Sequence, residues 1–340
     1  MSQELLLEKR CQIGPFRCPQ GVPTACDKSE RRMKRLALLA CALVIATGCS
    51  KGAETTTTTP AGGKTIGVSI QDREAPFYQS MEAGMKAEAQ KYGYTVNVVD
   101  ASRDNSKQQS QVEDFISQKV AAIVLTPYDS QAIGSAIVEA NKAAIPVFTA
   151  DIANASNQGV VISHIASDNV AGGGQAGKLI CAAVAAGGTV AILDEPEVTS
   201  VQDRVRGFKA ALAKSCPTVT IVADIDGGGE RAQASSATED ILQSHKDLKG
   251  IFGSNDDMAL GAATAVDAAG LTGKVAIVGY DADADARTAI ANGTMYGDAI
   301  QHPDQIGAKT IDTIAAYFAG KPVPKKIAVA VGTFTKADAK

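Results

Sequence analysis

The chain has 340 residues, with 33 Lys and Arg against 37 Asp and Glu and a formal net charge of −4. This length suffices for one large or two medium domains, each with its own apolar core. Nucleic-acid binding needs clustered basic residues, and an excess of acidic over basic residues does not indicate such a cluster. We therefore exclude a nucleic-acid partner.

Residues 1–48 are predicted to be an export leader. The basic residues Lys34 and Arg35 precede ten apolar residues at 36–45. A ten-residue helix is about 15 Å long, roughly half the hydrocarbon core of a bilayer, so the segment fits a secretory signal and not a membrane span. We place the true start at Met33, with an unusually long leader as the alternative.

Cys49 follows the small residues Ala-Thr-Gly, which resembles the lipobox of bacterial lipoproteins. That resemblance implies that Cys49 carries a lipid and becomes the first residue of the mature chain. Residues 49–63 are then predicted to be a tether, because KGAETTTTTPAGG has no apolar periodicity and is rich in Thr, Pro and Gly. The protein is expected to be periplasmic or otherwise extracytoplasmic and anchored to a membrane.

From residue 65 onward, short β-branched runs alternate with amphipathic runs whose apolar residues recur at three- and four-residue spacing. A first series predicts strands at 65–70, 95–99, 122–125 and 146–149, and helices at 77–92, 106–118 and 131–143. A second series predicts strands at 189–193, 219–223, 250–253, 275–278 and 295–300, and helices at 201–214, 231–244, 258–269 and 283–291. Repeated βαβ units predict an α/β protein with two doubly wound parallel-sheet lobes.

In such sheets, ligands bind beyond the carboxyl ends of the strands. Polar residues follow several of the predicted strand ends, in SIQDREAPFY (69–78), in TPYD (126–129), and at Asp151, Asn255 and Asp281. We expect these residues to line a cleft between the two lobes.

The sequence contains no recognisable catalytic arrangement. His164, His245 and His302 are far apart without HExxH spacing, and no GxSxG motif occurs. We predict that the protein is not an enzyme and uses no metal or cofactor. The glycine runs 172–174 and 227–229 lack the P-loop and dinucleotide-binding patterns. They fit tight turns and close backbone approach, and the alternative is that their amides line the cleft.

Cys181 and Cys216 remain in the mature chain together with Cys49. In an oxidising compartment Cys181 and Cys216 can pair. The alternative is two buried thiols, because the sequence does not show the distance between them.

Asp151 and Asp281 each end an apolar strand, where a carboxylate faces a partly dry cleft. Hydroxyl groups of a sugar satisfy carboxylate oxygens, whereas an anion is repelled, so the ligand is predicted to be neutral or cationic. Phe77 and Tyr78 can stack on the apolar face of a sugar ring, and the alternative is that Phe77 packs into the core. Arg73 in the same loop opposes a cation unless Asp72 or Glu74 screens its charge, so a neutral ligand is favoured.

From residue 64 to the C-terminus, the chain resembles the periplasmic sugar-binding proteins of the ribose-binding type, the type I periplasmic binding proteins that feed ABC transporters. The resemblance rests on APFYQSMEAGMKAEAQKYGY, LTPYDSQAIGSAIVEAN, VISHIASDNVAGG, SNDDMALGAATAV, IVGYDADADA and AIQHPDQIGAKTI. It implies a monomer that captures a neutral monosaccharide, pentose or hexose, and delivers it to an ABC importer permease. The alternative on the same fold is a sugar-sensing receptor or the effector-binding half of a repressor.

The resemblance also implies site residues, and several positions depart from the family's pattern. Ile152 and Gln202 stand where the family's ribose binders have arginines, Thr126 replaces an Asn, and Ile225 stands where a second-lobe aromatic is expected. Arg73 is therefore expected to supply the missing guanidinium. The predicted ligand-binding set is Arg73, Glu74, Phe77, Tyr78, Thr126, Asp151, Gln202, Asn255, Asp281 and Gln301.

The resemblance further implies that the chain crosses between the lobes three times, near 166–168, 301–302 and 327–331. The first lobe then comprises 64–166 with 302–328, and the second comprises 167–301 with 329–340. Three crossings make a hinge, and closure around the sugar is the signal that the permease reads.

Overall fold

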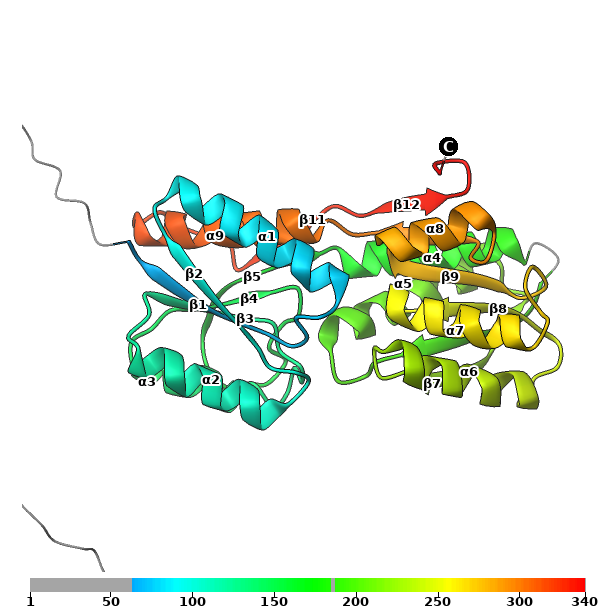
Figure 1. Cartoon of the computed structure of the whole chain (residues 1–340), viewed down its shortest axis with the longest axis horizontal. Coiled ribbons are helices and arrows are strands. Elements are labelled where there is room, and N and C mark those ends of the chain that lie inside the picture. The colour runs from blue at the N-terminus through cyan, green and yellow to red at the C-terminus, as the bar shows by residue number, and fades with distance from the viewer. Residues whose placement is uncertain (1–62, 185–186, 340) are drawn as a thin grey trace, which may run out of the picture. The chain divides into compact units, whose positions relative to one another are not determined.

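The computed structural model describes residues 63–184 and 187–339, which form two α/β lobes (Figure 1). The predicted leader, the lipidation site Cys49 and the tether up to residue 62 lie outside the described residues. Within the described ranges, no helix has both the length and the apolar character needed to cross a bilayer.

The first lobe is a parallel sheet in the order β11-β5-β4-β3-β1-β2, covered by helices on both faces. Its elements are β1 (Thr65–Ile70), α1 (Pro76–Lys91), β2 (Thr95–Asp100), α2 (Asn105–Ser117), β3 (Ala122–Leu125), α3 (Gly134–Lys142), β4 (Val147–Ala150), β5 (Val161–Ser167), α9 (Pro303–Phe318) and β11 (Lys326–Val329). Strand residues alternate between the faces, so Ala122 and Val124 pack with α1 and α9, whereas Ile123 and Leu125 pack with α2 and α3 (Figure 1).

The second lobe repeats this architecture in the order β12-β10-β9-β8-β6-β7, with only β12 antiparallel to its neighbour in this sheet. Its elements are α4 (Asn169–Ala183), β6 (Gly188–Asp194), α5 (Thr199–Ser215), β7 (Val219–Asp226), α6 (Arg231–Ser244), β8 (Leu248–Gly253), α7 (Asp256–Ala268), β9 (Ala276–Asp281), α8 (Ala284–Asn292), β10 (Gly297–Ile300) and β12 (Gly332–Thr335). Two doubly wound parallel-sheet lobes confirm the predicted fold class.

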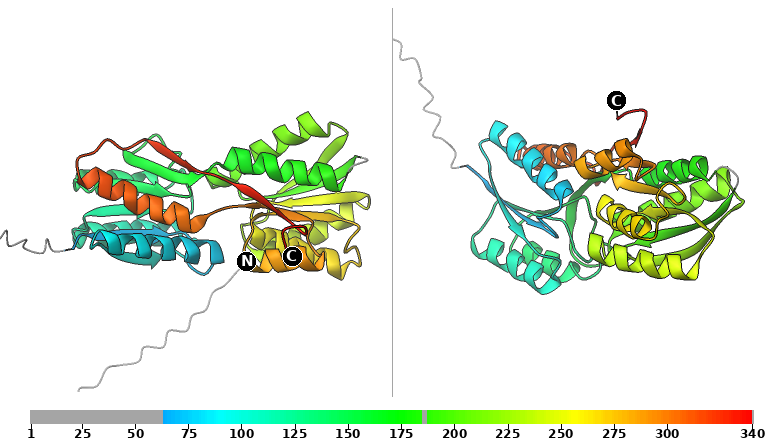
Figure 2. Two further views of the ribbon diagram at one scale, coloured as in Figure 1. Left: turned by 90° about the horizontal axis from the view of Figure 1, so that it is seen from above. Right: turned by 45° about the vertical axis from the view of Figure 1, so that its right-hand side comes forward.

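The chain passes between the lobes where β5 gives way to α4, where β10 gives way to α9, and where β11 gives way to β12. Asp168 lies at the first of these points and caps α4 by accepting a hydrogen bond from the amide of Ala171 at 3.1 Å. Figure 2 shows the last crossing as the red segment that leaves the first sheet and ends in β12.

No bounds were predicted for helix α4, because its run of glycines at 172–174 is unfavourable in a helix. Tertiary packing overrides that propensity. A Cβ atom at Gly173 would collide with the backbone carbonyl of Arg204 in α5, and one at Gly207 in α5 would collide with the carbonyl of Val170. The glycines therefore allow the two helix backbones to lie in direct contact.

A disulfide joins these two helices near their ends. Cys181 lies in the last turn of α4 and Cys216 directly follows α5, with 5.7 Å between their Cα atoms. Both side chains pack against the core cluster between α4, α5 and the sheet. The sequence left open whether Cys181 and Cys216 are paired or are two buried thiols, and the structure shows the disulfide.

Candidate ligand-binding site

A cavity lies between the lobes, at the carboxyl ends of the strands of both sheets. Because all the strands concerned are parallel, the residues that follow them meet at one edge of each sheet. The polar residues contributed by these strand ends are Gln71, Asp151, Glu195, Asn255, Asp281 and Gln301.

The first lobe contributes a chain of buried hydrogen bonds. Gln71 Nε2 donates to the Tyr78 hydroxyl at 2.6 Å, and that hydroxyl donates to Asp151 Oδ2 at 3.2 Å. Tyr78 is positioned by the first turn of α1, where Pro76 provides a backbone angle suited to a helix start. Asp151 has a φ of 63°, in the left-handed region that non-glycine residues rarely adopt. Such strained backbone is characteristic of functional positions.

The second lobe contributes a buried arginine from α5. Arg204 Nη1 donates to the Ser254 carbonyl at 2.8 Å, and Nε donates to Asn169 Oδ1 at 3.0 Å. The guanidinium lies 4.1 Å over the centre of the Tyr280 ring, and Nη1 lies 3.9 Å from Asp281 Oδ1. The hydrogen bonds and the ring fix the plane of the guanidinium and leave it at the wall of the cavity.

Two further side chains of the second lobe are held by local hydrogen bonds. Gln301 Nε2 donates to Asp281 Oδ1 at 2.6 Å. Asn255 is the N-cap of α7, where its Oδ1 accepts from the amide of Met258 at 2.8 Å and its Nδ2 donates to the Gly229 carbonyl at 3.1 Å.

Two of the carboxyl groups that line the cavity, those of Asp151 and Asp281, have pKa values shifted from their ordinary range. Burial raises the pKa of Asp151 above its ordinary value and raises that of Asp281 well above it, and the positive charge of Arg204 opposes the increase in both. Burial and the nearby Asp151 also raise the pKa of Tyr78 well above its ordinary value, so its hydroxyl stays neutral. The site therefore combines buried acceptors with the fixed positive charge of Arg204.

Three oxygen atoms of cavity-lining side chains are buried without a hydrogen-bond partner among the described residues: Gln71 Oε1, Asp151 Oδ1 and Gln301 Oε1. Leaving a buried acceptor unsatisfied costs about 1–3 kcal/mol. All three atoms accept and none donates, so the group that satisfies them must supply several hydrogen-bond donors.

Apolar side chains complete the walls. Phe77 and Tyr78 line the cavity with their rings in an edge-on arrangement, 5.1 Å between centroids, and both also belong to the core of the first lobe. Ile152 follows Asp151 and packs into the core of the second lobe, where Val198 and Val201 form the facing wall. The cavity thus offers apolar surface beside its polar groups.

The structure brings six of the ten predicted site residues to this cavity and leaves four outside it. Those that line it are Phe77, Tyr78, Asp151, Asn255, Asp281 and Gln301. The four residues that do not line it are Arg73, Glu74, Thr126 and Gln202. Thr126 is fully buried, and Gln202 is exposed with its amide donating to the Pro196 carbonyl at 2.6 Å.

Arg73 requires a correction. Its Nε and Nη2 atoms each donate to the carboxylate of Glu82 at 2.6 Å, and its side chain is 42% exposed. Because α1 places Glu82 beside the loop, the guanidinium is held on the outside of the first lobe, and Glu74 beside it is exposed too. The cavity arginines are instead Arg103 and Arg204.

Sequence reasoning missed Gln71, Arg103, Glu195 and Arg204. A signal existed for Arg204, because it lies among Val201, Val205 and Phe208 on the apolar stripe of α5. A charged residue on the buried face of a helix needs a buried partner and so indicates a site. Arg103 lacked such a signal, since it lies in a polar loop after β2.

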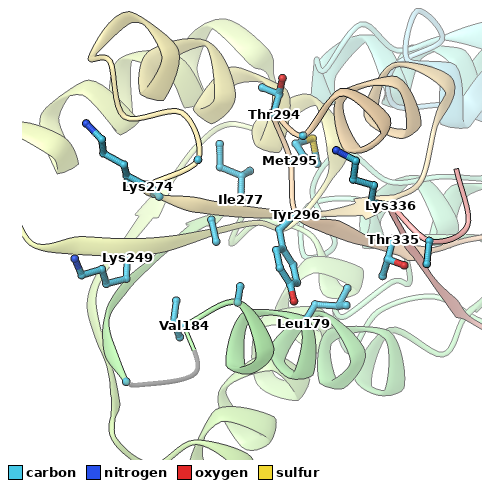
Figure 3. A pocket seen from close by; sticks show the side chains of 17 residues that line it. Leu179, Val184, Lys249, Lys274, Ile277, Thr294, Met295, Tyr296, Thr335 and Lys336 are labelled. Carbon is cyan, nitrogen blue, oxygen red and sulfur yellow. The ribbon is translucent and has the colours of Figure 1, made fainter.

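A larger surface hollow of about 810 Å³ lies elsewhere in the second lobe (Figure 3). It is found at the amino ends of β8, β9 and β10, the end opposite to that where such sheets bind ligands. Figure 3 shows Lys249 and Lys274 pointing outward at its rim, while Tyr296 lies beside Leu179. Polar groups do not converge there.

In residues 63–184 and 187–339, no group of three or more His, Cys, Asp or Glu is placed to hold a metal ion.

Comparisons with known proteins agree with this geometry. Residues 66–322 match the model of the periplasmic binding protein domain. The chain is 36% identical to the ribose import binding protein of Bacillus subtilis, over 77% of this chain and 84% of that protein.

Two solved structures share the fold. An ABC transporter solute-binding protein from Agrobacterium vitis, bound with α-D-tagatopyranose, superposes with a TM-score of 0.77 at 27% identity, covering 81% of this chain and 95% of that one. The Caulobacter myo-inositol binding protein, bound to myo-inositol, superposes with a TM-score of 0.76 at 29% identity, covering 81% of this chain and 94% of that one. The chain belongs to the periplasmic binding protein family.

Proposed function

We propose that this protein captures a neutral monosaccharide or a related polyol between its lobes and delivers it to an ABC importer. The observation that carries the proposal is the set of three partnerless acceptors on Gln71, Asp151 and Gln301. Sugar hydroxyls are donors that satisfy such atoms and also accept from Arg204. The relatives support this ligand class, since their names specify ribose, tagatopyranose and myo-inositol.

Charge argues for a neutral ligand. The acidic residues that line the cavity are Asp151, Glu195, Asp257, Asp281 and Asp283, and the cations that line it are Arg103 and Arg204. Arg103 is paired with Glu195, and the charge of Arg204 interacts with the carboxyl groups of Asp281 and Asp151. A phosphorylated sugar would bring further negative charge to buried carboxylates, which is unfavourable.

Ligand entry requires the lobes to separate. The cavity measures about 40 Å³ in this structure, well below the roughly 300–1,000 Å³ of typical small-molecule sites. Three chain crossings connect the lobes and provide the hinge. Closure around a sugar then presents both lobes to the permease in one fixed arrangement.

A thermal-shift panel of pentoses, hexoses, cyclitols and sugar phosphates tests the ligand class. A ligand present at 100 times its Kd stabilises the folded state by about 2.7 kcal/mol. We expect at least one neutral compound to raise Tm and the phosphorylated compounds to leave it unchanged. Stabilisation by sugar phosphates alone would overturn the proposal.

The membrane anchor is part of the proposal and is supported by the sequence Ala-Thr-Gly-Cys at 46–49. We propose that Cys49 is lipidated and that the protein acts as a monomer on the membrane surface. Cys49→Ala is expected to release the protein from the membrane fraction without changing its affinity for ligand. Retention of the variant in that fraction would contradict the anchor.

A further inference from the structure

Arg103 reaches from the first lobe into the second. It lies in the loop between β2 and α2, and its Nη1 donates to Glu195 Oε1 at 3.0 Å and to the Gly228 carbonyl at 2.7 Å. Its Nη2 donates to the Gly229 carbonyl at 3.3 Å. All three acceptors belong to the second lobe. The side chains of Arg103 and Glu195 are 15% and 6% exposed, so water is largely excluded from the pair.

The glycine run at 227–229 forms the receiving surface. Gly228 and Gly229 have φ angles of 65° and 70°, in the region that favours glycine. A Cβ atom at Gly229 would lie 2.9 Å from Arg103 Nη1 and 2.6 Å from Glu195 Oε2, so a side chain there would displace the pair. The run therefore presents carbonyl oxygens to the cleft, and not the amides considered in the sequence analysis.

The loop that carries Arg103 is itself held in an unusual conformation. Ser102 and Arg103 have φ angles of 50° and 55°, which is strained for two successive non-glycine residues. Asp100 holds the loop by accepting from the Ser102 amide at 2.9 Å and from the Ser102 hydroxyl at 2.6 Å. The amide of Arg103 donates to the Gln71 carbonyl at 2.8 Å. These contacts lie within the first lobe and direct the guanidinium outward.

We propose that Arg103 is a closure residue, whose guanidinium binds a socket on the second lobe formed by Glu195 and the carbonyl oxygens of Gly228 and Gly229. Every acceptor in this socket belongs to the protein, so its contribution to closure does not depend on ligand. The socket sets the fraction of ligand-free protein in which the lobes are closed.

This assignment has a consequence for affinity, which rests on the proposed function. When only the closed arrangement binds tightly, the apparent Kd equals the intrinsic Kd divided by the closed fraction. Losing the ion pair leaves Glu195 buried and unpaired in the closed state, which favours opening. Opening restores water to Glu195, while Arg103 keeps its contact with Asp72 Oδ2 in its own lobe, at 3.2 Å.

The test measures the distance between the lobes in the full chain without ligand. Spin labels are attached through p-acetylphenylalanine at positions 113 and 240, which avoids the cysteines. These positions lie on α2 and α6, on the side of the lobes away from the three crossings (Figure 1). We expect Arg103→Ala to shift the distance distribution toward longer values than in the unsubstituted chain, and Glu195→Gln to do the same.

Arg73→Ala is the matched control, because Arg73 lies in the neighbouring loop but pairs with Glu82 inside the first lobe. It should leave the distances unchanged. The double variant of Arg103→Ala and Glu195→Gln should open the protein no further than Arg103→Ala alone, because removing the guanidinium already removes its contact with Glu195. An unchanged distribution in both folded single variants, checked by circular dichroism, would overturn the proposal.

Calorimetry with a ligand from the sugar panel provides the second readout. We expect Arg103→Ala to weaken binding by about tenfold. The affinity of Arg103→Lys should lie between that of Arg103→Ala and that of the unsubstituted protein, because lysine keeps the charge but lacks the planar guanidinium. A loss of affinity with unchanged lobe distances would make Arg103 a ligand contact and would overturn its role in closure. If no neutral compound binds, the proposed function fails, while the distance measurement still decides whether Arg103 holds the lobes together.

Discussion

Arg204 Nη1 lies 3.9 Å from Asp281 Oδ1, and the side chains are 5% and 14% exposed. The two residues come from different elements, α5 and β9, so their approach is set by the fold of the second lobe. Neither can lose its charge without leaving the other less compensated in a low-dielectric cavity. This pair therefore makes the site sensitive to substitution.

Arg204→Ala is expected to weaken sugar binding by about ten- to a hundredfold, because a hydrogen bond to a charged group contributes roughly 1.5–3 kcal/mol. Calorimetry with the best ligand of the panel measures the change. Arg206→Ala is the matched control, since Arg206 lies two residues further along α5 with a side chain that is 63% exposed. Equal affinities for both variants would contradict a role for Arg204.

The disulfide is expected to contribute substantially to stability. Cys181 and Cys216 are 35 residues apart in the sequence, and closing a loop of that length in the unfolded chain stabilises the native state by about 3–4 kcal/mol in the chain-entropy model. The variant with both cysteines replaced by Ser should show this loss in urea unfolding, while ligand affinity stays within twofold. No change in unfolding free energy would argue against the bond.

Asp298 is expected to make stability depend on pH. It is fully buried in β10, where burial raises its pKa to about 8 and a hydrogen bond with the neighbouring carboxyl of Asp256 opposes the increase. The folded state therefore keeps this proton up to about pH 8, whereas the unfolded chain releases it near pH 4. Stability from this group is lost as pH rises between these values, by about 1.4 kcal/mol per pH unit.

Asp298→Asn tests this dependence, because it keeps the shape of the side chain and removes its ionisation. Relative to the unsubstituted protein, the variant should gain stability as pH rises from 5 to 8 in urea unfolding. Asp240→Asn on the exposed face of α6 serves as the control and should keep the original slope. An unchanged slope in Asp298→Asn would show that the buried carboxyl is ionised at neutral pH.

Much of the fold follows from local sequence patterns. Strands such as β1 and β3 are short β-branched runs, and the helices between them repeat apolar residues every three or four positions. Helix α4 escaped this reasoning because its glycines weaken the helical pattern, and their value becomes visible only where α4 meets α5. Local periodicity does not predict close packing between segments that are distant in the sequence.

The candidate site, like the fold, was only partly predictable from the sequence. Asp151, Asn255 and Asp281 were predictable because parallel strands end at one edge, whereas Gln301 was implied only by the family resemblance. Arg73 was wrongly placed in the cavity, since proximity to a strand end says nothing of the direction that a side chain takes, and Glu82 draws it outward. Gln71 directly follows β1 in the same loop and does line the cavity.

The most direct test of the central claim is calorimetry of the panel's best neutral sugar with the unsubstituted protein and with Asp151→Asn. Asn tolerates the left-handed backbone that Asp151 adopts at φ 63°, so this variant removes charge and acceptor strength with little change in shape. We predict one-to-one binding that weakens at least tenfold in the variant. Binding of equal strength in both proteins, or no binding of any neutral sugar or polyol, would contradict the account.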